Sequence, residues 1–161
     1  MNDSKDEVKI ISYEAQYKEA FKKLNEEWIR TFFVMEASDY KLLDHPEEEI
    51  LNKGGHIVFA ILNDEAVGTC ALMKSEHEPV TYELAKMVVS PKAQGKKIGY
   101  LLGKTLVDLA RELKAEKIVL ETNSVLVPAI KLYEKLGFRH IPITDAGYDR
   151  VDVQMQLNIR D

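Results

Sequence analysis

The chain has 161 residues and a mass of 18.4 kDa, which corresponds to one domain that is long enough to bury a core without disulfides. Apolar residues make up 45% of the chain and charged residues 30%, a balance typical of soluble globular proteins. The 22 basic and 27 acidic residues give a net charge of −5. Because general nucleic-acid binders usually carry a basic surplus, we expect no nucleic-acid partner.

The single cysteine and the first residues bear on the compartment. Cys70 cannot form an internal disulfide or a multi-cysteine zinc site, and a reducing compartment fits it best. Residues 1–7 have no apolar stretch like that of a signal peptide, and no apolar run approaches the ~20 residues of a membrane-spanning helix. The four histidines share no metal-ligand spacing. We therefore expect a cytoplasmic protein with neither a membrane nor a metal partner, with residues 1–7 as a disordered tip and residues 8–161 as a single domain.

Short apolar runs alternate with helical patterns along the rest of the chain. Strands are predicted over residues 8–13, 56–62, 66–73, 81–89, 118–122, 138–143 and 151–159. Helices are predicted over residues 17–32, from Pro46 onward, over 98–113 and over 128–136. Antiparallel strands come first and strand–helix–strand units later. This order predicts an α/β domain with a mixed, mainly antiparallel sheet flanked by helices.

The most informative segment runs from Val88 to Tyr100, where a strand ends, a polar loop with glycine follows, and a long helix begins. The free amides and the dipole of a helix start bind phosphate readily, and three lysines between residues 92 and 97 add positive charge. On these residues alone, a phosphate site and a solvated basic helix start are equally open.

Three segments, in this order, resemble the GCN5-related N-acetyltransferase (GNAT) family. Residues 83–91 (ELAKMVVSP) are similar to its central strand, residues 94–99 (QGKKIG) to its Q/R-x-x-G-x-G/A pyrophosphate loop, and residues 129–138 (AIKLYEKLGF) to its late helix and the strand after it. The resemblance covers nearly the whole chain. It implies the GNAT acyl-CoA N-acyltransferase fold, acetyl-CoA as the cofactor, and acyltransferase activity.

The chain departs from the family pattern at two positions. The first glycine of the loop falls on Lys97, which we expect to be tolerated if the backbone there is helical. The asparagine that often precedes the late helix falls on Leu126, and Asn123 is the nearest residue that could replace it.

The resemblance implies a cofactor site in which the pyrophosphate lies on backbone amides and the pantetheine arm pairs with Met87 and Val89. The expected cofactor-binding residues are Met87, Val88, Val89, Gln94, Gly95, Lys96, Lys97, Ile98, Gly99, Tyr100 and Asn123.

The implied reaction is direct acetyl transfer to a primary amine of a small molecule, an amino acid or a peptide. Glu83 is the expected general base, because an apolar strand raises the pKa of a carboxyl group; a solvated or ion-paired Glu83 is the alternative. Tyr133 is the implied general acid for the departing CoA thiolate, and an aromatic ring packed in the core is the alternative.

The acceptor is expected to enter between the early helices and the last hairpin. The expected substrate-binding residues are Trp28 and Phe32 in an apolar wall, Glu36, which would attract a cationic amine together with Asp39, and Tyr148, which would close the site with Arg150. The alternatives are that the aromatic residues belong to the hydrophobic core and that the acids are solvated.

A non-catalytic acyl-CoA-binding module on the same fold is the second functional hypothesis, because fold alone does not fix function. A homodimer is the family-level expectation.

Overall fold

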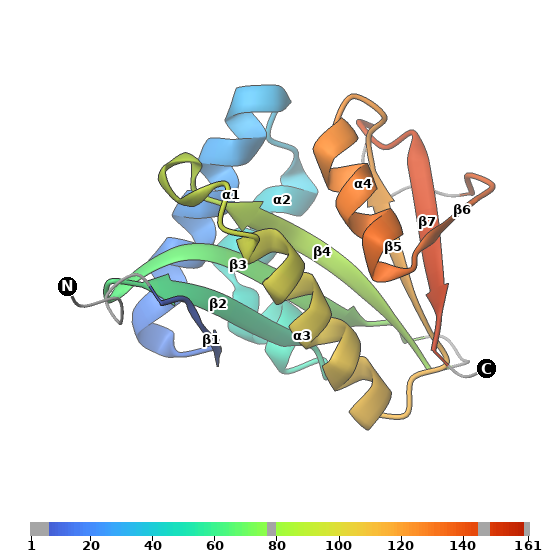
Figure 1. The fold of residues 1–161 in the computed structure, drawn as a ribbon, viewed down its shortest axis with the longest axis horizontal. Helices are drawn as coiled ribbons and strands as arrows, with labels where there is room; N and C mark the ends of the chain where they lie inside the picture. The colour runs from blue at the N-terminus through green and yellow to red at the C-terminus, as the bar shows by residue number, and fades with distance from the viewer. Residues whose placement is uncertain (1–6, 77–79, 145–148, 160–161) are drawn as a thin grey trace.

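The computed structural model describes residues 7–76, 80–144 and 149–159. A seven-stranded sheet in the order β1-β2-β3-β4-β5-β7-β6 forms its centre (Figure 1). The strands are β1 (Lys9–Ser12), β2 (His56–Leu62), β3 (Glu65–Lys74), β4 (Thr81–Val89), β5 (Lys117–Thr122), β6 (Arg139–Ile141) and β7 (Val153–Asn158). The helices are α1 (Lys18–Phe32), α2 (Ala37–Asp44), α3 (Ile98–Glu112) and α4 (Val127–Leu136), with the short helices η2 (Ala15–Tyr17), η3 (Glu47–Leu51) and η4 (Pro91–Ala93). The predicted mixed α/β architecture is confirmed.

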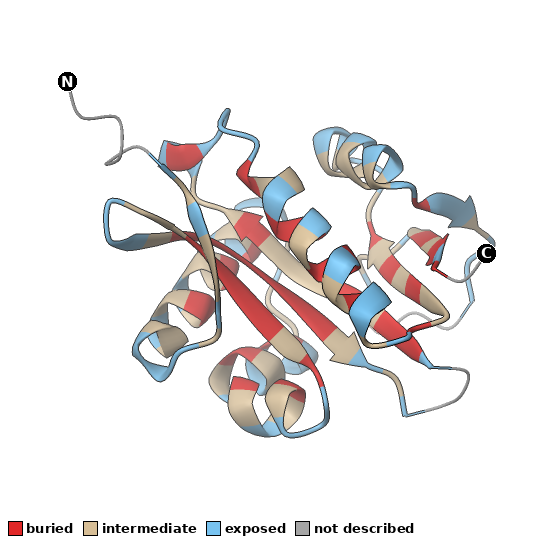
Figure 2. Cartoon of the chain, turned by 60° about the horizontal axis from the view of Figure 1, so that its bottom comes forward, coloured by how far each residue is buried: buried red, intermediate tan, exposed pale blue. Residues whose placement is uncertain are grey.

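Two hydrophobic cores lie on opposite faces of the sheet, because alternate residues of a strand point to opposite sides. Val58 and Ala60 of β2 belong to the core that α3 and α4 cover. Ile57 and Phe59, their neighbours in the strand, belong to the core beneath α1 and α2. Figure 2 shows buried residues running along the central strands between these helical layers. The sheet is therefore covered on both faces.

Local sequence signals account for most element boundaries. The α3 helix spans Ile98–Glu112, within one residue of the predicted range, and buries one apolar stripe along its length. The α4 helix ends at Gly137, whose φ of +107° is a conformation that glycine adopts without steric cost. Asn63 and Asp64, both with positive φ, form the turn of the predicted hairpin between β2 and β3.

Three elements differ from the sequence-based expectation. The sequence did not predict α2 as a helix. Its start is marked by an unusual capping box, in which Glu36 and Asp39 bond to each other's backbone amides. The helix predicted from Pro46 is a five-residue π-helix, η3. The late hairpin is shorter than expected: β6 has three residues, and β7 lies between β6 and β5 in the sheet.

Strands β4 and β5 are the one parallel pair of the described sheet, and they pair over only three residues on each strand. Thr81–Glu83 of β4 lie opposite Lys117–Val119 of β5. Beyond Glu83 the two strands diverge, so that β4 continues along β3 and β5 continues along β7 (Figure 1). The sheet therefore opens in its middle, and one edge of β4 faces the opening.

Strand β4 also contains a bulge next to this opening. The register between β3 and β4 shifts between Thr69 and Ala71, and Lys86, on the opposite strand, has a φ of +56°. Bulges of this kind redirect a side chain and occur often beside functional sites.

Candidate active site

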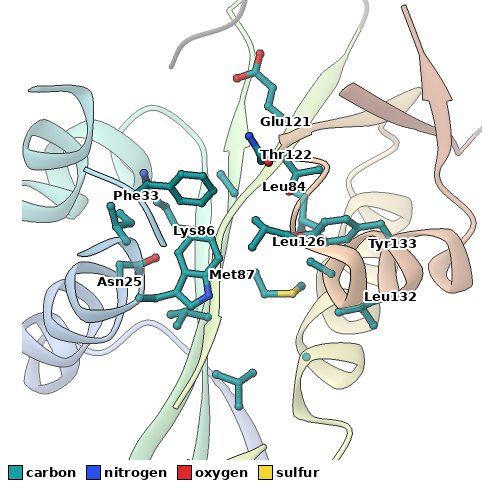
Figure 3. A pocket seen from close by; sticks show the side chains of 18 of the residues that line it. Asn25, Phe33, Leu84, Lys86, Met87, Glu121, Thr122, Leu126, Leu132 and Tyr133 are labelled. Atoms are coloured by element: carbon teal, nitrogen blue, oxygen red, sulfur yellow. The ribbon is translucent and has the colours of Figure 1, made fainter. Parts of the chain in front are cut away.

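A cleft of about 600 Å³ occupies the opening between β4 and β5 (Figure 3). Its lining falls into two groups on opposite faces of the sheet. The α1 half is lined by Asn25, Trp28, Ile29, Phe33, Leu42, Met73, Glu83, Lys86, Glu121 and Arg150. The α3 half is lined by Met87, Val89, Gln94, Gly99, Pro128, Ala129, Leu132 and Tyr133. Strand β4 runs between the halves, so a group bound in one can meet a group bound in the other.

Glu83 faces the α1 half at the point where β4 and β5 separate. It lies directly opposite Met73 of β3, and opposite residues of paired strands point to the same face. The pKa of Glu83 is raised to about 7, mainly by burial and also by the negative charge of Glu121, while Lys86 opposes the shift. A carboxyl group with this pKa can accept a proton near neutral pH.

Tyr133 reaches the cleft from α4, on the other half. Its ring also packs edge-on against Phe138, so Tyr133 lines the cleft and contacts the core at the same time. Burial raises the pKa of its phenol, and the buried Cys70 thiol adds to this. The hydroxyl group therefore stays protonated at neutral pH and can donate a proton.

The start of α3 presents free backbone amides beside the cleft. Leu101 is the first residue whose amide bonds to a carbonyl at the helix start, that of Lys97, so the helix offers no acceptor to the amides of residues 98–100. A side chain at Gly99 would approach Leu132 within 3.1 Å and Met87 and Val89 within 3.9 Å. The absence of a side chain at Gly99 therefore keeps this part of the cleft open.

The backbone of Lys97 is not right-handed helical, in contrast to the expectation from the sequence. It has a φ of +60° and a ψ of +24°, a left-handed conformation, and it is the N-cap of α3. The position thus keeps the geometry for which a glycine is suited, although a lysine occupies it.

Most of the residues expected at the site line the cleft, and the others fall into clear groups. Those in the lining are Trp28, Glu83, Met87, Val88, Val89, Gln94, Gly99, Asn123 and Tyr133. Gly95, Lys96, Lys97, Ile98 and Tyr100 form the loop and the first turn of α3 without lining the cleft, and the Ile98 side chain is buried in the core. Tyr148 lies outside the described residues.

Three expected residues have surroundings that differ from those anticipated. Phe32, the last residue of α1, is 53% exposed, packs on Trp28 and Phe33, and does not line the cleft. Glu36 is held by an ion pair with Arg150 at 3.2 Å. Asn123 lines the cleft, but its side-chain Nδ2 donates to the Arg150 carbonyl at 2.7 Å and its Oδ1 accepts from the Val125 backbone amide at 2.9 Å, which fixes the loop before α4.

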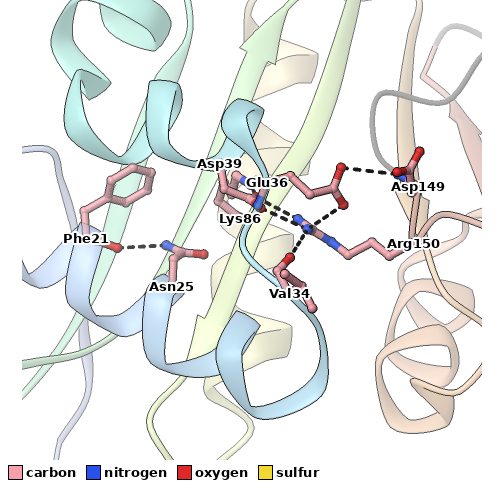
Figure 4. Close-up of polar contacts among 8 residues, drawn as sticks. All are labelled: Phe21, Asn25, Val34, Glu36, Asp39, Lys86, Asp149 and Arg150. Atoms are coloured by element: carbon pink, nitrogen blue, oxygen red, sulfur yellow. Dashed lines mark hydrogen bonds and ion pairs between the residues drawn. The ribbon is translucent and has the colours of Figure 1, made fainter.

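A buried ion cluster borders the α1 half (Figure 4). Asp39 is fully buried and accepts hydrogen bonds from Arg150 at 2.7 and 2.9 Å and from Lys86 at 2.7 Å. Burial opposes ionisation of Asp39, but these bonds and one from the Glu36 amide outweigh it and lower its pKa to about 2. Asp39 is thus neither solvated nor available to attract an amine, in contrast to both sequence-based alternatives.

Two residues of the cleft were missed at the level of sequence. Lys86 was read only as part of the central strand, and its unusual feature was a lysine within an otherwise apolar run. Glu121 was read as part of a buried strand, and a charged residue between Leu120 and Thr122 was the available signal. Both signals are weak, because charged residues in strands usually face solvent.

Comparison with known proteins decides the family. The family model described as "Acetyltransferase (GNAT) family" matches residues 20–138, which include the β4 strand, the α3 loop and all of α4. The chain belongs to the GNAT family. The resemblance seen in three sequence segments is thus confirmed.

Two relatives match this GNAT chain over different lengths. An uncharacterized N-acetyltransferase from Schizosaccharomyces pombe is 28% identical over 144 residues, covering 83% of this chain and 86% of the relative. N-acetylaspartate synthetase from Mus musculus is 38% identical over 86 residues, covering 53% of this chain. The matched segment spans only 28% of the length of that synthetase.

Two solved structures share the fold. An acetyltransferase of the GNAT family from Staphylococcus aureus Mu50 superposes with a TM-score of 0.85 at 25% identity, covering 96% of this chain and all of that one. An acetyltransferase from Salmonella typhimurium, solved with its cofactor acetyl-CoA, has a TM-score of 0.78 at 20% identity, covering 97% and 96% of the two chains. Among the described residues of this chain, no helix is long and apolar enough to cross a membrane.

Proposed function

We propose that this GNAT protein binds acetyl-CoA in the α3 half of the cleft and transfers the acetyl group to a primary amine in the α1 half. The observation that carries the proposal is the placement of Glu83 and Tyr133 on opposite sides of one cleft, with opposite proton-transfer properties. Burial raises both pKa values, so Glu83 can accept a proton near neutral pH while the Tyr133 hydroxyl group stays protonated there.

The cofactor half has the chemistry that acetyl-CoA needs. Free amides at the start of α3 offer a site for the pyrophosphate. The open edge of β4 along Met87 and Val89 offers backbone groups to the pantetheine arm, and such groups can also stabilise the oxyanion that forms on the thioester carbonyl. The Salmonella relative, solved with acetyl-CoA, supports this assignment by analogy.

The acid and base act at different moments of the reaction. Glu83 takes a proton from the ammonium group of the acceptor, directly or through water, which frees the nitrogen lone pair to attack the thioester carbon. The C–S bond then breaks, and Tyr133 donates its proton to the departing thiolate. The acetyl group ends as an amide, and CoA leaves as a free thiol.

The identity of the acceptor is not carried over from a relative. The name of N-acetylaspartate synthetase makes aspartate one acceptor to test, although only 86 residues match that protein.

A non-catalytic acyl-CoA-binding module is the competing proposal. It predicts binding of the cofactor without transfer. The homodimer, the cytoplasmic location and the single-domain boundaries stay predictions from the sequence.

Amine-dependent release of CoA thiol tests the proposal. With saturating acetyl-CoA and a panel of primary amines that includes L-aspartate, the wild type is expected to release thiol with at least one acceptor. Tyr133→Phe removes the acid, and we expect kcat to fall by roughly 10²-fold or more while the Kd for acetyl-CoA changes little. Tyr17→Phe, whose ring packs on Phe59 outside the cleft, is the matched control. Unchanged turnover in Tyr133→Phe would remove Tyr133 from this role.

A further inference from the structure

The charged side chains of the cleft are concentrated in its α1 half. Among the residues that the structure describes, four charged residues line the cleft, namely Glu83, Lys86, Glu121 and Arg150, and all four belong to that half. The α3 half is lined by apolar side chains together with Gln94, Gly99 and Tyr133. The balance of charge in the α1 half therefore bears on which acceptors enter it.

The two cations of this half are already balanced by protein carboxylates. Lys86 and Arg150 both bond to the buried Asp39, at 2.7 Å in each case, and Arg150 forms a second ion pair with Glu36 at 3.2 Å. In Figure 4, Arg150 extends across to Glu36 and Asp39 and directs its guanidinium toward their carboxylates. A substrate carboxylate would have to compete with these internal partners.

The remaining carboxylates, Glu83 and Glu121, share one face of the sheet. Glu83 lies opposite Val119 of β5, and Glu121 follows Val119 by two residues, so both point to the α1 side. Gln154 donates a hydrogen bond to Glu121 at 3.0 Å and fixes its position. The charge of Glu121 also raises the pKa of Glu83, which shows that the two groups interact.

Counting formal charges gives the sign of this half. Glu36, Asp39, Glu83 and Glu121 contribute four negative charges, and Lys86 and Arg150 contribute two positive charges. Over these six described residues, the excess is two negative charges, or one when Glu83 holds a proton. An ammonium group is favoured in such a site, whereas a further carboxylate meets like charge in a partly desolvated space.

The rest of the α1 half is apolar. Trp28 and Ile29 from α1, Phe33 after it, Leu42 from α2 and Met73 from β3 form its walls. Figure 3 shows Phe33 beside Lys86 on one side of the cleft and Glu121 at its far end. The site thus has an apolar wall and a negatively charged end.

We infer that the acceptor is a primary amine with an apolar body and no carboxylate next to its nitrogen, and that Glu121 is a specificity-determining residue that selects it. This inference rests on the proposed function. It narrows the acceptor class from amines in general, because it disfavours free α-amino acids.

Three related compounds separate the effect of charge from that of shape. Phenethylamine, L-phenylalaninamide and L-phenylalanine present the same ring and amine, but only the last carries a carboxylate. With saturating acetyl-CoA, we expect kcat/KM for phenethylamine and for the amide to exceed that for phenylalanine by at least about 10-fold. In Glu121→Gln, which keeps an oxygen to accept the Gln154 bond, we expect this ratio to fall at least about 3-fold, through a higher KM for the amines.

Two further readouts distinguish selection by charge from a structural role. Removing the charge of Glu121 should lower the pKa of Glu83, so the acid limb of the pH profile should move to lower pH. Glu112→Gln, an exposed charge at the far end of α3, is the matched control and should leave the ratio and the limb unchanged. Thermal unfolding of both variants checks that the fold is retained.

The outcomes separate the inference from the proposed function. Phenylalanine used as well as or better than phenethylamine would overturn the inference while leaving acetyl transfer intact. An unchanged ratio in Glu121→Gln would remove Glu121 from the selecting role. Binding of acetyl-CoA without thiol release from any of the three compounds, or from the wider amine panel, would contradict both proposals.

Discussion

Glu83 is the residue on which the chemistry depends most. Its raised pKa of about 7 means that it is protonated, and unable to accept a proton, below that pH. We therefore expect kcat/KM for the amine to rise with pH through a midpoint near 7. Glu83→Gln should lose this limb and lower kcat by about 10²- to 10⁴-fold. A pH profile measured at saturating acetyl-CoA checks this, with Glu112→Gln as the control for loss of one charge.

A profile that is flat between pH 5.5 and pH 8.5 (roughly one and a half units either side of the expected midpoint) would contradict this role for Glu83. So would a Glu83→Gln variant that keeps the acid limb. The pH profile is measured with phenethylamine, a simple alkyl amine that titrates near pH 10, far enough from the limb to leave it distinct.

Lys97 is a residue whose backbone is strained for its type. A non-glycine residue in the left-handed region costs roughly 1–2 kcal/mol, part of which a glycine recovers. We expect Lys97→Gly to raise the free energy of unfolding by about 1 kcal/mol and to leave acetyl-CoA binding within about 3-fold of wild type, because the amide geometry is kept. Urea denaturation measures the first quantity. Lys96→Gly, whose φ is not positive, should give no stabilisation, and equal effects of the two variants would contradict the argument.

At the scale of elements, the α2 helix is anchored to the rest of the molecule by Asp39. Its carboxylate joins Lys86 in the β4 bulge to Arg150 before β7. Asp39→Asn keeps the shape but removes the charge that balances two cations, so we expect a loss of about 3 kcal/mol in the free energy of unfolding. Asp108→Asn, in an exposed pair with Lys104, should change it little. A loss no larger than that of the Asp108 control would contradict this view of the cluster.

The same cluster gives a pH dependence of stability. The pKa of Asp39 is about 2 in the folded state, below its ordinary value of 3.8, so the unfolded state takes up the proton first as pH falls. The stabilisation from ionised Asp39 is therefore complete above about pH 4 and is lost between pH 4 and pH 2. We expect chemical denaturation to show this decline in the wild type and a smaller one in Asp39→Asn. Equal declines would show that Asp39 does not contribute.

The elements that could be predicted from sequence are those whose information is local. The periodicity of α3, the turn at Asn63 and Asp64, and the string that ends at Gly137 each lie within one short segment. The Asp39–Arg150 pair was not predictable in this way, because its residues are 111 positions apart and meet only when the sheet closes. The bulge at Lys86 was missed for a related reason: it depends on register with β3 and not on the β4 sequence alone.

In the candidate site, too, the residues that could be predicted are those whose signal lies within one short segment. Glu83, Tyr133 and the α3 loop could be proposed from the sequence because each belongs to a segment that resembles the family, and Glu83 and Tyr133 line the cleft. Phe32 was misplaced because one helical stripe does not say which of its last residues reaches the cleft and which remains at the surface. Glu121 enters the site only through the divergence of β4 and β5, which no single segment encodes.

At the scale of the whole molecule, the cleft exists because the sheet is nearly two sheets. Strands β1–β4 and strands β5–β7 are joined by three paired residues on each side, and Arg150 connects them again across the α1 half. Each of the two cores stabilises its own face, so the opening between β4 and β5 does not have to be filled by side chains. This arrangement lets a cofactor on one face meet an acceptor on the other.

The measurement that tests the account most directly is calorimetric titration of the protein with acetyl-CoA, compared between the wild type and Gly99→Glu. The new side chain would extend between Leu132 and Met87 and place a negative charge where the pyrophosphate is proposed to lie. We expect binding in the micromolar range or tighter for the wild type and none detectable for Gly99→Glu, with Gly99→Ala intermediate. A folded wild type that binds neither acetyl-CoA nor CoA, or a Gly99→Glu variant that binds as tightly as the wild type, would contradict the account.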